Sequence, residues 1–164
     1  MSRRDKSRAG LRFLNRGANK NGNVSNFAET EQILTIFGGE GYRIFSHMQV
    51  RGSIPFFWTQ TPDCKWAPKV QIRQNVDLNK EAYKNHMKFC LNQYGEVTMI
   101  NLIDNKPGGS QQKLGQKFSE LDRENPSEHI KLIWFDFHAK TKGMKYSNLS
   151  ELLEEIDNNI ESNR

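Results

Sequence analysis

The sequence predicts a mixed α/β fold: an antiparallel strand meander in the first half, then β-α-β units with flanking helices. Residues 10–75 alternate short apolar stretches with glycine and asparagine turns, which is typical of antiparallel strands. Residues 76–164 alternate helical apolar stripes with nearly continuous apolar runs, which is typical of parallel strands joined by helices. We see no internal repeat and no clear domain boundary, so we expect one mixed-sheet unit or a piece of one.

The turns of the first half define its elements. Residues 1–9 are expected to form an irregular basic lead-in, and residues 11–16 a first strand. Asn21-Gly22 tolerates the positive φ of a hairpin turn, so the chain should return in a second strand over residues 24–37. Glycines at positions 38, 39 and 41 predict another turn, followed by a third strand over residues 42–50.

The segment from Gln49 to Trp58 joins an aromatic run, suited to a buried strand, to Arg51 and Gly52. Glycine inside a strand usually marks the close approach of another backbone or of a ligand. Arginine offers a planar, charged fork that suits phosphate. Arg51 is therefore a candidate phosphate-binding residue. The alternative is an arginine whose stem packs on the protein while its head reaches solvent.

The second half reads as helix, strand, helix, strand, helix. We expect Asp77 to cap the first helix, and the runs 97–103 and 130–137 to be strands of buried type. The apolar residues of the three helices recur at helical spacing and are expected to face the core. They are Tyr83, Met87, Cys90, Leu91 and Tyr94; then Leu114, Phe118 and Leu121; then Leu149, Leu152, Leu153, Ile156 and Ile160.

Asp136 and His138 are further candidate binding residues. They end the second of these strands, and the carboxyl ends of parallel strands are where α/β sheets bind ligands. Because they alternate with Phe135 and Phe137, both polar side chains would point to one side of the sheet. The alternative is a strand-terminal pair that caps nearby backbone groups.

Positive charge is concentrated at one end of the chain. The first 20 residues carry seven basic side chains and one acidic one, a net charge of +6, whereas the remaining 144 carry −1. Such a block implies an anionic partner, with a solvated tail as the alternative. Nucleic acid is a poor candidate, because the aromatic residues lie in runs too apolar to be exposed. Phospholipid headgroups and an acidic protein surface remain as partners. Four arginines are candidates to face an anionic membrane: Arg3, Arg4, Arg8 and Arg12.

The cysteines and histidines exclude several kinds of chemistry. Phosphate-cleaving cysteine enzymes place the thiolate six residues before an arginine, but Val70 follows Cys64 and Glu96 follows Cys90 at that spacing. The four histidines show no metal-ligand pattern, and we expect neither a metal nor a cofactor. No apolar run approaches the ~20 residues that span a bilayer.

Five runs together resemble the SAC-type phosphoinositide phosphatase domain of suppressor-of-actin proteins and synaptojanins. They are RAGLRF (8–13) with Arg16-Gly17, NFAETEQ (26–32), QVRGSIP (49–55) with Trp58, INL (100–102) and FDFH (135–138). Leu11, Phe13 and His47 stand where this family usually has Thr, Tyr and Phe. The family's catalytic Cys-x5-Arg loop would follow FDFH but is not among the 164 residues, so we expect a partial domain, truncated at both ends.

The resemblance implies a phosphoinositide phosphatase that hydrolyses inositol-ring phosphates through a cysteinyl-phosphate intermediate. The chain would divide into the lead-in 1–9, a strand-rich part 10–75 and an α/β part 76–164. Its partners would be phosphoinositide lipids, through peripheral contact with the cytosolic face of the endoplasmic reticulum, Golgi or endosomes, and the missing half of its own domain. The alternative is a catalytically silent remnant that binds anionic phospholipid. Left uncovered by that half, the chain expressed alone is expected to be prone to aggregation or to depend on a partner.

Overall fold

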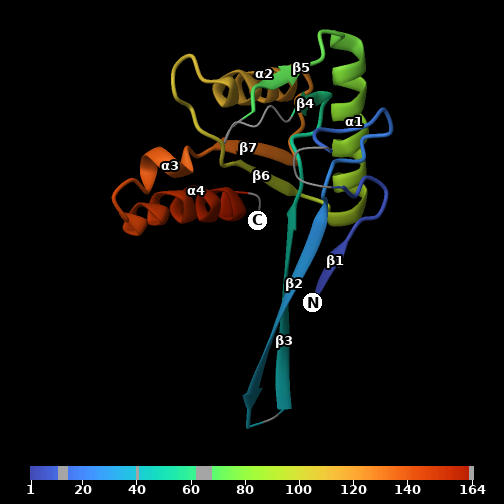
Figure 1. The fold of residues 1–164 in the computed structure, drawn as a ribbon. Helices are drawn as coiled ribbons and strands as arrows, with labels where there is room; N and C mark the ends of the chain where they lie inside the picture. Colours follow the sequence, from blue (N-terminus) through green and yellow to red (C-terminus); the bar gives the residue numbers. More distant parts are fainter. Residues whose placement is uncertain (11–14, 40, 62–67, 163–164) are drawn as a thin grey trace. The chain divides into compact units, whose positions relative to one another are not determined.

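The computed structural model describes residues 1–10, 15–39, 41–61 and 68–162 (Figure 1). It divides into two compact units, residues 1–87 and 88–164, and the division falls within helix α1 (Val76–Tyr94). Strands and helices are mixed as predicted, with antiparallel pairing in the first unit and parallel pairing in the second. The predicted α/β class is therefore confirmed, but the described strands form three separate sheets, each wholly antiparallel or wholly parallel, in place of one mixed sheet. Each unit is described below by itself.

The first unit contains two antiparallel sheets. The larger has the order β1-β2-β3, and its strands are β1 (Ser2–Arg4), β2 (Ala28–Gly38) and β3 (Gly41–Arg51). The smaller pairs β4 (Trp58–Gln60) with β5 (Val70–Ile72). The lead-in is not wholly irregular, because residues 2–4 pair with residues 28–30. The returning strand begins at Ala28 rather than Val24, and most of the first predicted strand, residues 11–14, lies outside the described residues.

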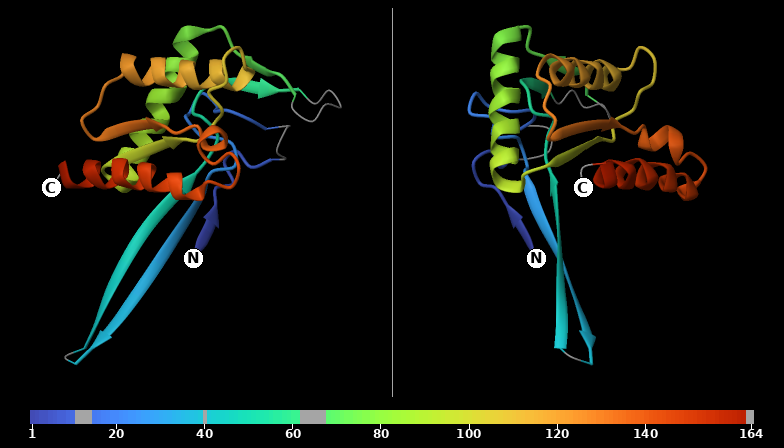
Figure 2. Two further views of the ribbon diagram at one scale, coloured as in Figure 1. Left: turned by 90° about the vertical axis from the view of Figure 1, so that its left-hand side faces the viewer. Right: turned by 180° about the vertical axis from the view of Figure 1, so that it is seen from behind.

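Strands β2 and β3 form a hairpin of eleven consecutive residue pairs, from Ala28↔Arg51 to Gly38↔Gly41. Figure 2 shows the two strands running together away from the part of the first unit where β1 pairs with β2. The predicted turn at residues 38–41 connects them, and the predicted third strand coincides with β3 to within one residue at each end.

The core of the first unit explains the glycine of the QVRGSIP run. A Cβ atom at Gly52 would lie 2.7 Å from Cγ2 of Val24 and 3.1 Å from Cδ2 of Phe27. Val24 and Phe27 are both buried. Glycine at position 52 predicted the close approach of another group, and that group is the pair of core side chains Val24 and Phe27.

The next residue of that run, Ser53, joins two segments of the first unit. Its hydroxyl accepts a hydrogen bond from the Gly17 N–H (2.9 Å), and its own N–H donates to the Ser25 carbonyl (3.1 Å). The predicted turn before Val24 is also present. Gly22 has φ +81° there, and its N–H donates to the Asn19 carbonyl at 3.0 Å.

Helix α1 is capped by Asn75 and not by Asp77. The Asn75 side-chain oxygen accepts the Leu78 N–H at 2.9 Å, which satisfies one of the free N–H groups of the first turn. Asp77 lies inside that turn, where its charge still favours the helix dipole. The sequence does not show which of the two residues is the cap, because asparagine and aspartate both cap helices well.

The second unit is built on a parallel strand pair, β6 (Val97–Asn101) and β7 (Ile130–Trp134), joined through helix α2 (Ser110–Glu124). The predicted apolar stripe of α2 is buried. A Cβ atom at Gly115 of α2 would lie 2.4 Å from the Trp134 ring, so helix and strand are in close contact. Helix α3 (Phe137–Lys140), a 3₁₀ turn (Tyr146–Asn148) and helix α4 (Leu149–Ser162) follow.

Among the described residues, no helix combines the length and the apolar character needed to cross a bilayer. The same residues contain no group of three or more histidine, cysteine or acidic side chains placed to hold a metal ion.

Candidate functional site

The pairing register places two of the candidate arginines on one face of the large sheet. Arg4 pairs with Ala28, and Ala28 pairs with Arg51, so the three side chains form one row across β1, β2 and β3. Two strand spacings separate the Cα atoms of the arginines by about 10 Å. Both arginines are exposed, and neither side chain has a hydrogen bond or ion pair within the described residues. The next row of this face is uncharged: Ser2, Thr30 and Gln49.

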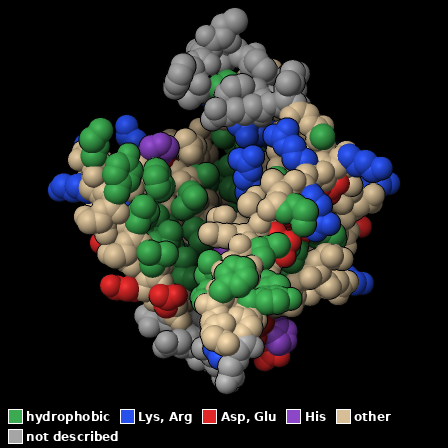
Figure 3. Space-filling view, turned by 90° about the horizontal axis from the view of Figure 1, so that it is seen from below, with side chains coloured by type: hydrophobic (Ala, Val, Ile, Leu, Met, Phe, Trp, Pro, Cys, Tyr) green, Lys and Arg blue, Asp and Glu red, His purple; other side chains and the backbone are tan. Residues whose placement is uncertain are grey.

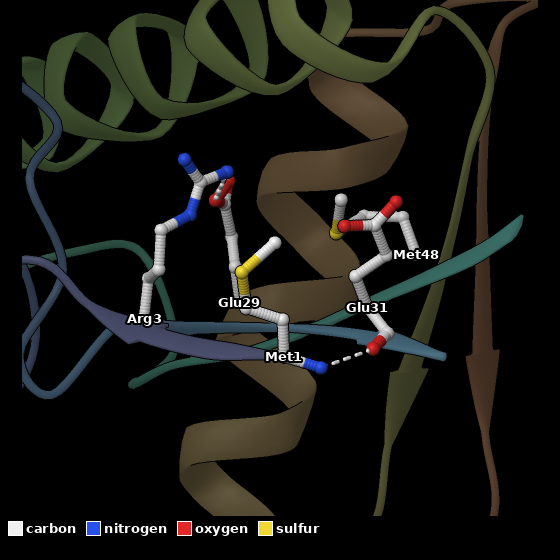
Figure 4. A pocket seen from close by; sticks show the side chains of 5 residues that line it. All are labelled: Met1, Arg3, Glu29, Glu31 and Met48. Carbon is white, nitrogen blue, oxygen red and sulfur yellow. Dashed lines mark hydrogen bonds and ion pairs between the residues drawn. The ribbon is translucent and has the colours of Figure 1, made fainter. Parts of the chain in front are cut away.

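Arg3 lies on the opposite face of the same sheet. Its guanidinium forms a salt bridge of 3.1 Å with the Glu29 carboxylate, its direct cross-strand neighbour. Figure 4 shows this pair at a shallow pocket that Met1, Glu31 and Met48 also line, where the N-terminal amine donates to the Glu31 carbonyl at 2.6 Å. The charge of Arg3 is thus partly compensated, whereas no described residue compensates the charge of Arg4 or Arg51.

Arg8 has structural partners. Its Nε donates to the hydroxyl of the buried Ser25 at 3.0 Å, and one terminal nitrogen donates to the Arg16 carbonyl at 2.9 Å. Partial burial lowers the pKa of the guanidinium from its ordinary value, because the charged form loses solvation. These contacts anchor the lead-in to the core of the first unit. Arg12, the fourth membrane candidate, lies outside the described residues.

The other two candidates lie beyond the end of β7 in the second unit, but not as predicted. The strand ends at Trp134, and His138 belongs to helix α3. Asp136 is the N-cap of that helix, and its Oδ1 accepts the Ala139 N–H at 3.0 Å. Alternation on one strand face is therefore wrong. The capping alternative is present for Asp136, because an aspartate before a short helix stops the strand.

Asp136 also connects the chain segments that follow the two parallel strands. Its second oxygen, Oδ2, accepts the Asn105 N–H at 2.7 Å, so one carboxylate holds both the start of α3 and the loop after β6. The two segments meet because parallel strands deliver their carboxyl ends to the same edge.

Sequence reasoning missed the partner of His138, which is Asp104. The two are joined between Nδ1 and Oδ1 at 2.6 Å. Gln111 of α2 orients Asp104 twice, since its amide nitrogen donates to Oδ2 at 3.2 Å and its oxygen accepts the Asp104 N–H at 3.3 Å. A carboxylate that accepts Nδ1–H leaves Nε2 of the exposed imidazole as the nitrogen available to a ligand. The only sequence signal was the position of Asp104 just after a predicted parallel strand.

A buried amide lies at the end of the neighbouring strand. Asn101, the last residue of β6, is only 4% exposed, and its Nδ2 has no hydrogen-bond partner within the described part of the chain. Its Oδ1 accepts the Ile103 N–H at 3.3 Å. Such an unsatisfied donor is costly in a protein interior.

Cys90 is a buried residue of α1, and burial raises the pKa of its thiol to about 11. The thiolate needed for nucleophilic attack is therefore disfavoured at neutral pH. This agrees with the core-facing position predicted for Cys90. Cys64 lies outside the described residues.

Comparison with known proteins identifies the family. A family model described as "SacI homology domain" matches residues 1–142. The chain is 35% identical over 156 residues to phosphatidylinositol-3-phosphatase SAC1-B of Danio rerio, covering 95% of the chain and 25% of that protein. It is 32% identical over 156 residues to phosphatidylinositide phosphatase SAC2 of Homo sapiens, and 35% over 154 residues to synaptojanin-2 of Rattus norvegicus. Those alignments cover 95% and 93% of the chain, but 13% and 10% of the relatives.

The chain thus spans a quarter or less of the length of these relatives. The match nonetheless extends over most of the chain and includes all five runs that suggested the resemblance. The chain belongs to the SacI homology domain family.

Proposed function

We propose that the chain is part of a phosphoinositide phosphatase that removes phosphate from the inositol ring of membrane phosphatidylinositol phosphates. The observation that carries this proposal is the family match over residues 1–142, together with relatives named as phosphatases of such lipids. The nucleophile comes from outside the 164 residues, because no cysteine in them precedes an arginine by six positions.

Phosphate release tests this proposal. We expect the purified chain alone to release no phosphate from a short-chain phosphatidylinositol phosphate. A chimera in which the chain replaces the matched stretch of the zebrafish SAC1-B protein should release it. Changing the cysteine of the implied Cys-x5-Arg loop to serine in that chimera should lower the rate by about 1000-fold or more.

Two results would contradict the proposed activity. One is phosphate release by the chain alone at the rate of the chimera. The other is a folded, monodisperse chimera that stays inactive under conditions in which the unmodified relative is active. Circular dichroism and size-exclusion chromatography of both proteins provide the folding control.

The part played by the first unit in this function is to bind anionic headgroups through Arg4 and Arg51. Their side chains share one face, are exposed and lack a compensating carboxylate within the described residues. Two guanidinium groups so spaced suit the phosphates of one lipid or of two neighbouring lipids. The same binding would serve the alternative of a catalytically silent lipid-binding protein. For either protein, we propose that the contact is with the cytosolic face of internal membranes.

Vesicle sedimentation tests this binding. Each arginine near an anionic surface contributes about 1 kcal/mol. The Arg4→Ala variant should therefore bind vesicles of phosphatidylcholine with 5% phosphatidylinositol 4-phosphate about fivefold more weakly, and the Arg4→Ala/Arg51→Ala double variant about 30-fold more weakly.

The matched control is Arg123→Ala, which removes an exposed arginine from helix α2 of the second unit. This variant has the same net charge as Arg4→Ala, so it separates a local site from a general effect of charge. Equal weakening by Arg123→Ala and Arg4→Ala would overturn the assignment of the face.

A further inference from the structure

The outer part of the β2–β3 hairpin carries large apolar side chains on both of its faces. The register puts Ile33, Phe37, Tyr42, Ile44 and Met48 on one face, and Leu34, Ile36 and Phe45 on the other. All eight are among the exposed large hydrophobic residues, and Phe37 and Tyr42 at the tip are 80% and 64% exposed. In the space-filling view from below, hydrophobic side chains lie open at the surface (Figure 3).

This pattern differs from that of a sheet with one wet face. A strand of a sheet with one solvent-exposed face alternates apolar and polar residues, whereas a strand that is covered on both faces is apolar throughout. Within the two segments 33–37 and 42–45, Arg43 is the single charged residue. The sequence of the hairpin is thus that of an interior element.

The edges of the hairpin are open as well. Strand β1 reaches β2 only at residues 28–30, with a further pair of backbone contacts between Met1 and Glu31. From Gln32 outward, β2 has no second strand partner, and β3 has none along its length, within the described residues. The register is continuous, so no bulge blunts either edge.

The open edges decide what kind of partner fits. A lipid bilayer supplies apolar cover but no hydrogen-bond partners, and unpaired strand edges do not occur in its hydrocarbon region. A polypeptide supplies both, because added strands pair the edges while apolar side chains cover the faces. The relatives contain such additional polypeptide, since the alignments leave 75–90% of their length unmatched.

We propose that the β2–β3 hairpin is a docking element for the SAC-domain polypeptide outside these 164 residues, which adds a strand to the free edge of β3 and covers both apolar faces. This inference rests on the family membership used for the proposed function, but not on catalysis. The partner is the part of the domain that the alignments leave unmatched: one of its strands pairs with the edge of β3, and further apolar segments of it cover the two faces.

Amide hydrogen exchange of the full 164-residue chain tests the proposal. The chain is measured alone, and after co-expression with a second polypeptide that contains the part of zebrafish SAC1-B outside the matched stretch. We expect rapid exchange of the outward N–H groups of residues 42–50 in the chain alone. In the complex, their exchange should slow on the order of 100-fold.

Two matched variants locate the contact. Ile44→Lys puts a charge on an exposed, apolar hairpin position and should abolish co-purification with the second polypeptide. Val76→Lys makes the same kind of change at a position of similar exposure, 53% against 59%, at the start of α1, and should leave the complex intact.

Several outcomes would overturn the inference. They are unchanged exchange of the hairpin in the complex, failure of two soluble polypeptides to associate, or equal effects of the two lysine variants. Protection of the chain alone that grows with its concentration would assign the edge to a second copy, and protection by phosphatidylinositol phosphate vesicles would assign it to lipid. Because hydrogen exchange needs no turnover, an inactive but protected complex would contradict the proposed activity and leave the docking inference standing.

Discussion

Replacement of Gly17 by alanine is expected to destabilise the first unit by about 4 kcal/mol. Gly17 has φ +64°, where an L-residue costs roughly 1–2 kcal/mol. A Cβ atom there would lie 2.4 Å from the Phe56 carbonyl oxygen and 2.9 Å from the Trp58 backbone nitrogen. Neither backbone atom can move away cheaply, since the Ala18 N–H donates to that same Phe56 carbonyl at 2.9 Å. Overpacking of this kind costs a further 1–3 kcal/mol, roughly.

Gly95→Ala is the control for this prediction. Gly95 has a similar φ of +76°, but an added Cβ would meet nothing within 4 Å. The Gly95→Ala change should lower the free energy of unfolding only by the cost of an L-residue at positive φ, about 1–2 kcal/mol. Exchange of the Ala18 N–H reports the first unit, and denaturant unfolding reports the whole chain. If Gly17→Ala loses no more stability than Gly95→Ala, the contact with residues 56–58 is not what requires glycine.

The stability of the first unit is expected to fall by about 3 kcal/mol as the pH is lowered from 7 to 4. The cause is His86 of α1, which is 9% exposed and whose Nδ1 contacts the Gly22 carbonyl at 3.0 Å. Because a carbonyl only accepts, Nδ1 carries the hydrogen in the neutral ring. Burial lowers the pKa of His86 from 6.5 to about 4, and the hydrogen bond to Gly22 opposes this shift only in part.

The sign follows from comparing the two states. Above pH 6.5, His86 is neutral whether the chain is folded or unfolded, and it adds no pH dependence. Between pH 6.5 and 4 only the unfolded chain binds the proton, so the free energy of unfolding falls as the pH falls. Below pH 4 both states are protonated and the loss is complete.

His86→Asn should abolish most of this slope, because the asparagine amide still donates to Gly22 but does not titrate. His129→Asn, at a position with a 57% exposed side chain, should retain it. Unfolding by urea at half-unit steps of pH measures both variants. A slope that survives in His86→Asn would show that another group controls the acid lability.

Much of the fold could be predicted because the chain marks its elements locally. The apolar stripe of Leu114, Phe118 and Leu121 gave α2, and the turn at residues 38–41 gave the hairpin. The ends of elements were predicted less well. Asn75 rather than Asp77 caps α1, because both residue types cap helices well and the sequence does not show which of them accepts a helix N–H. Strand β7 ends at Trp134, before Asp136, which caps α3.

The candidate site depended on register, which local patterns do not contain. Arg4 and Arg51 are 47 positions apart, and only the pairing of both with Ala28 puts them on one face. The bond between Asp104 and His138 likewise required the parallel pairing of β6 with β7. No sequence pattern distinguished Arg3, which pairs with Glu29, from Arg4, which does not.

The two hydrogen bonds accepted by Asp136 have a mechanical consequence. Since one carboxylate fixes Asn105 and Ala139, the loop after β6 and the first turn of α3 are constrained to move as one body. Lys140, at the end of α3, in turn pairs with Glu151 of α4. A displacement of α4 should therefore be transmitted through α3 to the loop after β6 by two side-chain connections, Asp136 with Asn105 and His138 with Asp104.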